Sequence, residues 1–137
     1  MYEEQHRCIL LISDNQIDIR RIETQFMDTG CMDCRLNRCT TITAAQELLK
    51  NKSKTIDIVI LDMRLLDSSV SEDHYNLIKS SAGDIPIIIL TGNKEEESKN
   101  AGLLVSSGAA AHIHLNNFGS LVRTIQATLF PRRNDVD

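Results

Sequence analysis

The chain of 137 residues has no tryptophan, few aromatic residues and no long apolar run. With only three phenylalanines and two tyrosines, its core must be built mainly from isoleucine and leucine. No apolar run reaches the roughly 18 residues that a membrane-spanning helix needs, which argues against a membrane protein. Because the first seven residues are also too polar for a secretion signal, we expect a cytoplasmic protein.

Several signatures of ligand binding are missing as well. The mild net charge of -4 and the lack of a basic stripe with interleaved aromatics argue against direct nucleic-acid binding. No Gly-x-Gly-x-x-Gly follows the first apolar segment, which argues against a dinucleotide-binding fold. Without a Walker-type loop or a second acid or base, a phosphate-ester hydrolase or nucleotide-binding enzyme is also disfavoured. We therefore expect a switch or binding module and not an enzyme.

Four cysteines leave a question about metal binding open. Cys31 and Cys34 have the spacing of half a zinc knuckle, and Cys39 follows closely. A second pair of this kind is missing, and cysteine also packs as a small apolar residue. The sequence favours ordinary packing or loop thiols and leaves a metal or redox role as the alternative.

Short apolar segments alternate with amphipathic ones along the whole chain, without a linker or repeat. Strands are expected at residues 8–12, 34–40, 56–61, 87–91 and 111–115. Helices are expected at residues 17–28, after a cap at Thr43, at about 74–81, at 94–106 and at 118–129 after a cap at Asn117, with a loop at 64–73. This alternation predicts an α/β three-layer sandwich with a five-stranded parallel sheet in the flavodoxin-like order 2-1-3-4-5. The length is that of one domain, so we expect a single domain over residues 1–137, with a core at about 8–129 and flexible tails.

Asp62 is the leading candidate for a functional residue, because it closes the buried strand expected at residues 56–61. The carboxyl ends of parallel strands are where open α/β sheets bind ligands. In the order 2-1-3-4-5 the first and third strands are neighbours, so Asp14 and Asp62 are expected side by side. Two carboxylates suit Mg²⁺, and Thr91, at the tip of the fourth strand, is placed to donate its hydroxyl to a phosphoryl group on Asp62.

Four segments, taken in order, resemble the receiver domain of two-component response regulators. They are Ile-Leu-Leu-Ile-Ser13-Asp14, Ile-Val-Ile-Leu-Asp62-Met-Arg-Leu, Ile-Pro-Ile-Ile-Ile-Leu-Thr91-Gly92 and Ser-Gly108-Ala109. The resemblance implies that Asp62 accepts a phosphoryl group from a sensor histidine kinase or phosphotransfer protein. It also implies Mg²⁺ held by Asp14, Asp62 and the main-chain carbonyl of Arg64, and an output domain or partner protein that reads the signal.

Two positions depart from the family pattern. Ser13 stands where receivers usually carry an acidic residue, and Leu115 stands where they carry a lysine at the tip of the fifth strand. A lysine charge at 4 Å from a phosphoryl oxygen is worth about 4 kcal/mol at an effective dielectric of about 20, so its loss matters. Lys94 and His114 are candidates for a substitute cation, and His112 stands where the family often has an aromatic switch residue, which would add pH sensitivity.

Two functions stay open on this basis. In the first, which the sequence favours because Asp62, Asp14 and Thr91 are all present, the chain is a switch that is phosphorylated at Asp62. In the second, it is a pseudo-receiver, which keeps the fold as a protein-interaction module and works without phosphorylation. A homodimer formed through the last helix is also left open.

Overall fold

The computed structural model describes residues 7–28, 34–52, 55–64, 71–92, 95–106 and 108–129. Five strands form one parallel sheet in the order β2-β1-β3-β4-β5. The strands are β1 (Arg7–Ile12), β2 (Cys34–Cys39), β3 (Ile58–Asp62), β4 (Ile87–Thr91) and β5 (Ala111–His114). The helices are α1 (Gln16–Asp28), α2 (Ile42–Lys52), α3 (Ser71–Ala82), α4 (Glu95–Ser106) and α5 (Leu121–Leu129), with a 3-10 helix η2 (Leu115–Ser120) before α5. The predicted fold class and strand order are confirmed.

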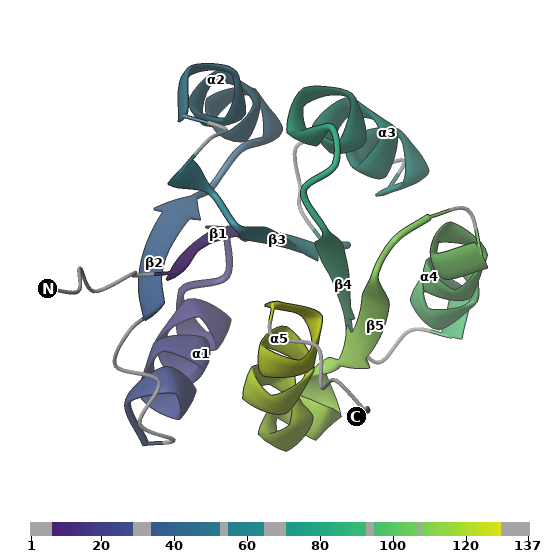
Figure 1. The fold of residues 1–137 in the computed structure, drawn as a ribbon. Coiled ribbons are helices and arrows are strands. Elements are labelled where there is room, and N and C mark those ends of the chain that lie inside the picture. Colours follow the sequence, from purple (N-terminus) through teal and green to yellow (C-terminus); the bar gives the residue numbers. More distant parts are fainter. Residues whose placement is uncertain are drawn as a thin grey trace, which may run out of the picture.

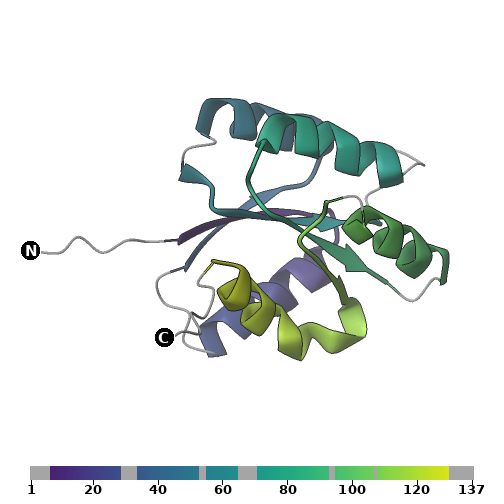
Figure 2. The ribbon, with the colours of Figure 1, turned by 45° about the vertical axis from the view of Figure 1, so that its right-hand side comes forward.

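The helices cover both faces of the sheet, which makes the three layers seen in Figures 1 and 2. Helices α1 and α5 lie on one face, and α2, α3 and α4 lie on the other. Every residue of β3 and β4 is buried, because both faces of these central strands are covered. This double cover explains why these strands appear in the sequence as continuous apolar runs.

Alternation along β3 assigns its side chains to the two faces. Ile58 and Ile60 pack in the cluster with α1 and α5, whereas Val59 and Leu61 pack in the cluster with α2, α3 and α4. Successive side chains of a strand point to opposite faces, so Asp62 continues the row of Ile58 and Ile60 toward α1. The strand therefore determines which helix the Asp62 carboxylate can reach.

The start of α2 differs from the prediction by two residues. Thr41, and not Thr43, caps this helix: the Ala44 backbone N–H donates to Thr41 Oγ1 over 3.1 Å, and the helix begins at Ile42. Threonines at both positions fit a cap by composition, and the hydrogen bond selects the earlier one.

Helix α3 also begins earlier than expected, at Ser71 and not near residue 74. Its first residues are polar, and so they were included in the predicted loop at 64–73. The helix ends at Gly83, whose positive φ of 63° and backbone hydrogen bond to the Lys79 carbonyl form a helix C-cap.

The segment after β5 differs most from the prediction. Leu115 does not extend the strand but begins η2, and Asn117 lies inside this 3-10 segment with non-helical angles, φ -117° and ψ 39°. Asn117 thus marks a kink between two helical turns, and the α-helical hydrogen bonding of α5 begins at Leu121. No helix within the described ranges is long and apolar enough to cross a membrane.

Candidate functional site at the carboxyl ends of the strands

Asp62 is completely buried at the end of β3, beside the end of β1. The Ser13 hydroxyl donates a hydrogen bond of 2.8 Å to Asp62 Oδ2. Ser13 follows directly after β1, and its backbone N–H donates to the Cys39 carbonyl at the end of β2. The residue that stands in place of the expected acid thus supports Asp62 by donating a hydrogen bond, whereas a second carboxylate would repel it.

Arg64 makes three further hydrogen bonds to the same carboxylate. Its backbone N–H and Nε donate to Asp62 Oδ1 over 2.9 and 3.0 Å, and Nη2 donates to Oδ2 over 2.9 Å. A carboxylate offers about four lone-pair positions, and Ser13 with Arg64 supplies four donors. The acceptor capacity of Asp62 is therefore filled.

Asp18 of α1 is the second carboxylate at this site. It is buried, and its Oδ2 accepts a hydrogen bond from Arg64 Nη2. Asn15 orients the start of the helix, because its Oδ1 accepts the Asp18 backbone N–H over 3.0 Å as an N-cap. Arg21, one turn along the helix, lies 3.8 Å from Asp18 Oδ1 and is half exposed. A guanidinium thus joins the end of β3 to the first turn of α1.

The charges of this cluster favour a permanently protonated Arg64. Burial by itself lowers the pKa of Arg64, but hydrogen bonds and charge interactions with Asp62 and Asp18 outweigh that effect and raise the pKa above its usual value. The Arg64 side chain is 26% exposed, while the side chains of Asp62 and Asp18 are 1% and 9% exposed. We call this Asp62–Arg64–Asp18 arrangement the arginine clamp.

The donor set as it stands does not fit Mg²⁺. Among residues 7–28, 34–52, 55–64, 71–92, 95–106 and 108–129, no three His, Cys, Asp or Glu side chains are grouped so as to hold a metal ion. Asp14 follows Ser13 and is partly exposed, but the oxygens of Asp62 are taken up by hydrogen-bond donors. The guanidinium occupies the position on Asp62 that a cation would need.

The cysteines add no metal site in the described part of the chain. Cys8 and Cys39 are free thiols on the neighbouring strands β1 and β2. Burial raises the pKa of Cys39, which disfavours the reactive thiolate. Cys31 and the Cys34 side chain lie outside the described residues, so a role for this pair stays a prediction.

Thr91 lies on the other face of the sheet. Its side chain continues the row of Ile87 and Ile89, which pack toward α2, α3 and α4, whereas Asp62 points toward α1. The buried Thr91 hydroxyl shares a hydrogen bond of 2.8 Å with His112 Nε2 of β5. Within the described ranges no hydrogen bond joins Thr91 to Asp62, although both stand at the same edge of the sheet.

The Thr91–His112 pair predicts a pH-dependent stability. Burial, followed by the charge of His114, lowers the pKa of His112, so below about pH 6.5 the unfolded chain binds more protons than the folded one. Stability is then complete above this pH and falls as the pH decreases, by at most about 1.4 kcal/mol per pH unit. Urea unfolding between pH 7.5 and roughly 5 measures the slope. We expect His112→Gln to flatten it and His114→Gln to keep most of it, and an equal slope in His112→Gln would contradict the assignment.

The three positions considered for the missing lysine charge have different environments. Leu115 is buried in the core cluster with α5, at the start of η2. His114 lies opposite Thr91 in the register of β4 and β5, and Lys94 lies outside the described residues. The cation that the structure places on Asp62 is the Arg64 side chain, which the sequence reasoning used only for its carbonyl.

Asp18 and the Arg64 side chain are the site residues that the sequence analysis missed. A signal for Asp18 was present: it is an acidic residue one turn before Ile22, on the buried side of α1. A signal for Arg64 was its position two residues after Asp62, where a turn allows its backbone N–H and side chain to reach that carboxylate. Neither signal identifies the pairing, because Asp18 and Arg64 are far apart in the sequence.

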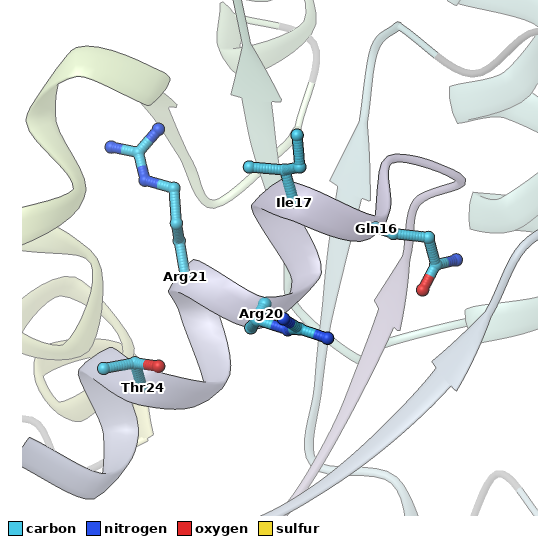
Figure 3. Close-up of a pocket in the computed structure, with 5 residues that line it drawn as sticks. All are labelled: Gln16, Ile17, Arg20, Arg21 and Thr24. Atoms are coloured by element: carbon cyan, nitrogen blue, oxygen red, sulfur yellow. The ribbon is translucent and has the colours of Figure 1, made fainter.

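A surface hollow lies along α1. Five residues of this helix line it, as Figure 3 shows: Gln16, Ile17, Arg20, Arg21 and Thr24. Ile17 is 73% exposed, and the two arginines extend from the helix in different directions. None of these five described lining residues carries a carboxylate, and the hollow is linked to the arginine clamp by the ion pair of Arg21 with Asp18.

Similarity to known proteins is found in the structure and not in the sequence. The sequence matches no family model and no curated protein. The structure is similar to the non-phosphorylated HemR receiver domain from Leptospira biflexa, with 23% identity, a TM-score of 0.69, and coverage of 95% of this chain and 99% of that one. A response regulator receiver protein from Sinorhizobium medicae shows 20% identity and a TM-score of 0.71 over 96% of this chain and all of the other. A receiver domain protein from Clostridium thermocellum shows 22% identity and a TM-score of 0.66 over 87% and 98%. This chain therefore has the fold of response regulator receiver domains.

Proposed function

We propose that this chain is a receiver-type signalling module that acts by binding other proteins while Asp62 stays unmodified. We further propose that it has no enzymatic turnover. The observation that carries the proposal is the filled Asp62 carboxylate, which accepts hydrogen bonds from the Ser13 hydroxyl and from three N–H groups of Arg64. Asp62 then has a structural role, because it links Ser13 and Arg64 at the edge of the sheet. The chain is in this sense a pseudo-receiver, in which the aspartate at the phosphoacceptor position is not phosphorylated.

The chemistry of phosphoryl transfer supports this reading. A carboxylate that attacks phosphorus needs a free lone pair, and the transferred group needs positive charge on its outer oxygens. Here the lone pairs are occupied, and the position of the usual lysine is taken by Leu115, a buried apolar residue. Asp62 could react only after Arg64 had left it.

The partners that we propose follow from the receiver fold. They are a sensor histidine kinase or phosphotransfer protein and an output domain or partner protein, bound through the helical surface. We propose no direct contact with nucleic acid or membrane, and we place the protein in the cytoplasm. A second copy of the chain is a further candidate partner.

Phosphorylation at Asp62 is the second candidate function, and one observation favours it. Arg64 already holds a positive charge against the carboxylate, at the sheet edge that also carries Thr91. In this candidate an Asp62 oxygen forms a bond to phosphorus while the P–N bond of a phosphohistidine, or the P–O bond of an acyl phosphate, breaks. The nitrogen or oxygen of the donor leaves with the electron pair, and Arg64 turns to the phosphoryl oxygens.

Intact-mass measurement after incubation with acetyl phosphate and Mg²⁺ separates the two functions. We expect no added phosphoryl mass on this chain, in a reaction where a phosphorylatable receiver domain is labelled in parallel. Asp62→Asn is the matched variant, since it changes only the acceptor. An adduct on the unaltered chain that is lost in Asp62→Asn would replace our proposal with the second candidate.

A further inference from the structure

The arginine clamp resembles a cation-binding site in which the carboxylates of Asp62 and Asp18 are the ligands and the Arg64 guanidinium is the cation. Two buried carboxylates from different elements, Asp62 of β3 and Asp18 of α1, both accept hydrogen bonds from Nη2 of Arg64. Nε of the same guanidinium gives Asp62 a second, parallel hydrogen bond of 3.0 Å. This forked geometry is the one in which a guanidinium binds a carboxylate most strongly.

A divalent cation and this guanidinium would compete for the same oxygens. Mg²⁺ keeps most of its water shell and usually takes only one or two carboxylates from a protein, so Asp62 would be its main ligand. To bind there, the ion would have to replace three Arg64 hydrogen bonds and then stand beside the displaced positive charge. The loss of these hydrogen bonds and the repulsion between the two cations both weaken metal binding. The bound guanidinium suffers neither penalty.

We propose that Arg64 is the resident cation of this sheet edge and takes the place of the divalent ion, so that the edge is assembled without metal. The inference rests on the proposed function in that both describe an unmodified Asp62. The two fail separately, because one is read from metal affinity and the other from a phosphoryl adduct. Arg64 is in this sense a positioning residue: it holds Asp62 and ties β3 to α1.

Metal titration of an arginine variant tests this directly. Mn²⁺ and Mg²⁺ are titrated by calorimetry into the unaltered chain, into Arg64→Met and into Arg20→Met. Arg20 is exposed on α1, so its variant loses the same charge at a distance from Asp62. We expect Arg64→Met to bind Mn²⁺ at least about tenfold more tightly than the unaltered chain, which is about 1.4 kcal/mol, and Arg20→Met to be unchanged.

Two outcomes of the titration would overturn the inference. One is a metal affinity of the unaltered chain that equals that of Arg64→Met. The other is the same gain in Arg20→Met, which would show a general charge effect and no competition at Asp62.

A measurement on the unaltered protein covers the case in which Arg64→Met does not fold. The arginine Nε–H groups are observed by ¹H–¹⁵N NMR, and the Arg64 signal is identified as the one that Arg64→Lys loses. We expect this signal to be protected from exchange with water and to keep its position when Mg²⁺ is added. A signal that shifts or exchanges rapidly once Mg²⁺ is present would show that the metal displaces the guanidinium.

Discussion

Replacing Arg64 with methionine is expected to lower the free energy of unfolding by about 3 kcal/mol. The change leaves the buried carboxylates of Asp62 and Asp18 without their common counter-charge. It also removes the two side-chain hydrogen bonds from Arg64 to Asp62 and the one to Asp18. The value lies at the lower end for a buried ion pair, because the guanidinium is 26% exposed. Urea unfolding at neutral pH, followed by circular dichroism, measures the loss.

A double-mutant cycle assigns this loss to the Asp62 contact. With Asp62→Asn as the second change, a coupling energy of about 2 kcal/mol between positions 62 and 64 is expected. Arg20→Met, which removes an exposed arginine, should change stability by less than about 0.5 kcal/mol. If Arg64→Met lowers the free energy of unfolding no more than Arg20→Met does, the arginine clamp does not stabilise the fold.

Replacing Leu115 with alanine is also expected to cost about 3 kcal/mol, because this side chain is packed in the core and not exposed at the site. Leu115 is 7% exposed and belongs to the cluster that includes Leu121 and Ile125 of α5. Truncation removes buried apolar surface and leaves a cavity between the sheet and α5. Thermal and urea unfolding both measure the change.

Leu103→Ala is the matched control for this prediction. Leu103 lies on α4 and is 65% exposed, so its truncation removes the same atoms from a surface position and should cost less than about 0.5 kcal/mol. Equal losses at the two positions would place Leu115 outside the core. A large loss at Leu115 alone would show that this position is used for core packing and not for holding a charge near Asp62.

The arginine clamp and Leu115 distinguish this site from the receiver pattern, in which a lysine at the position of Leu115 supplies the positive charge. Leu115, which directly follows β5, packs under α5, and the positive charge beside Asp62 comes from Arg64, two residues along the chain. The Arg64 guanidinium couples Asp62 to α1 through Asp18, so any change at Asp62 has to break that contact.

The location of Asp62 could be predicted from the sequence because it depends on local pattern and chain topology alone. A buried apolar run that ends on a carboxylate places the carboxylate at a strand tip, and the alternation of strands and helices places that tip beside the end of β1. The same reasoning placed Asp14 beside Asp62, whereas the structure shows that the preceding residue, Ser13, contacts Asp62 through its hydroxyl. The error at Thr43 is of another kind, because neighbouring threonines compete for the cap and only the hydrogen bond from Ala44 decides between them.

The sequence by itself determined the fold class, the strand order and the position of Asp62 at the carboxyl edge of the sheet, because periodicity and right-handed connections leave few alternatives. Only the tertiary structure decided what Asp62 does there. The pleat directs Asp62 toward α1 and Thr91 toward the opposite face, which separates two residues that their shared sheet edge had appeared to unite. Arg64 then meets Asp18, 46 positions away in the sequence, and the pairing of a guanidinium with two buried carboxylates is a matter of side-chain geometry that no local pattern specifies.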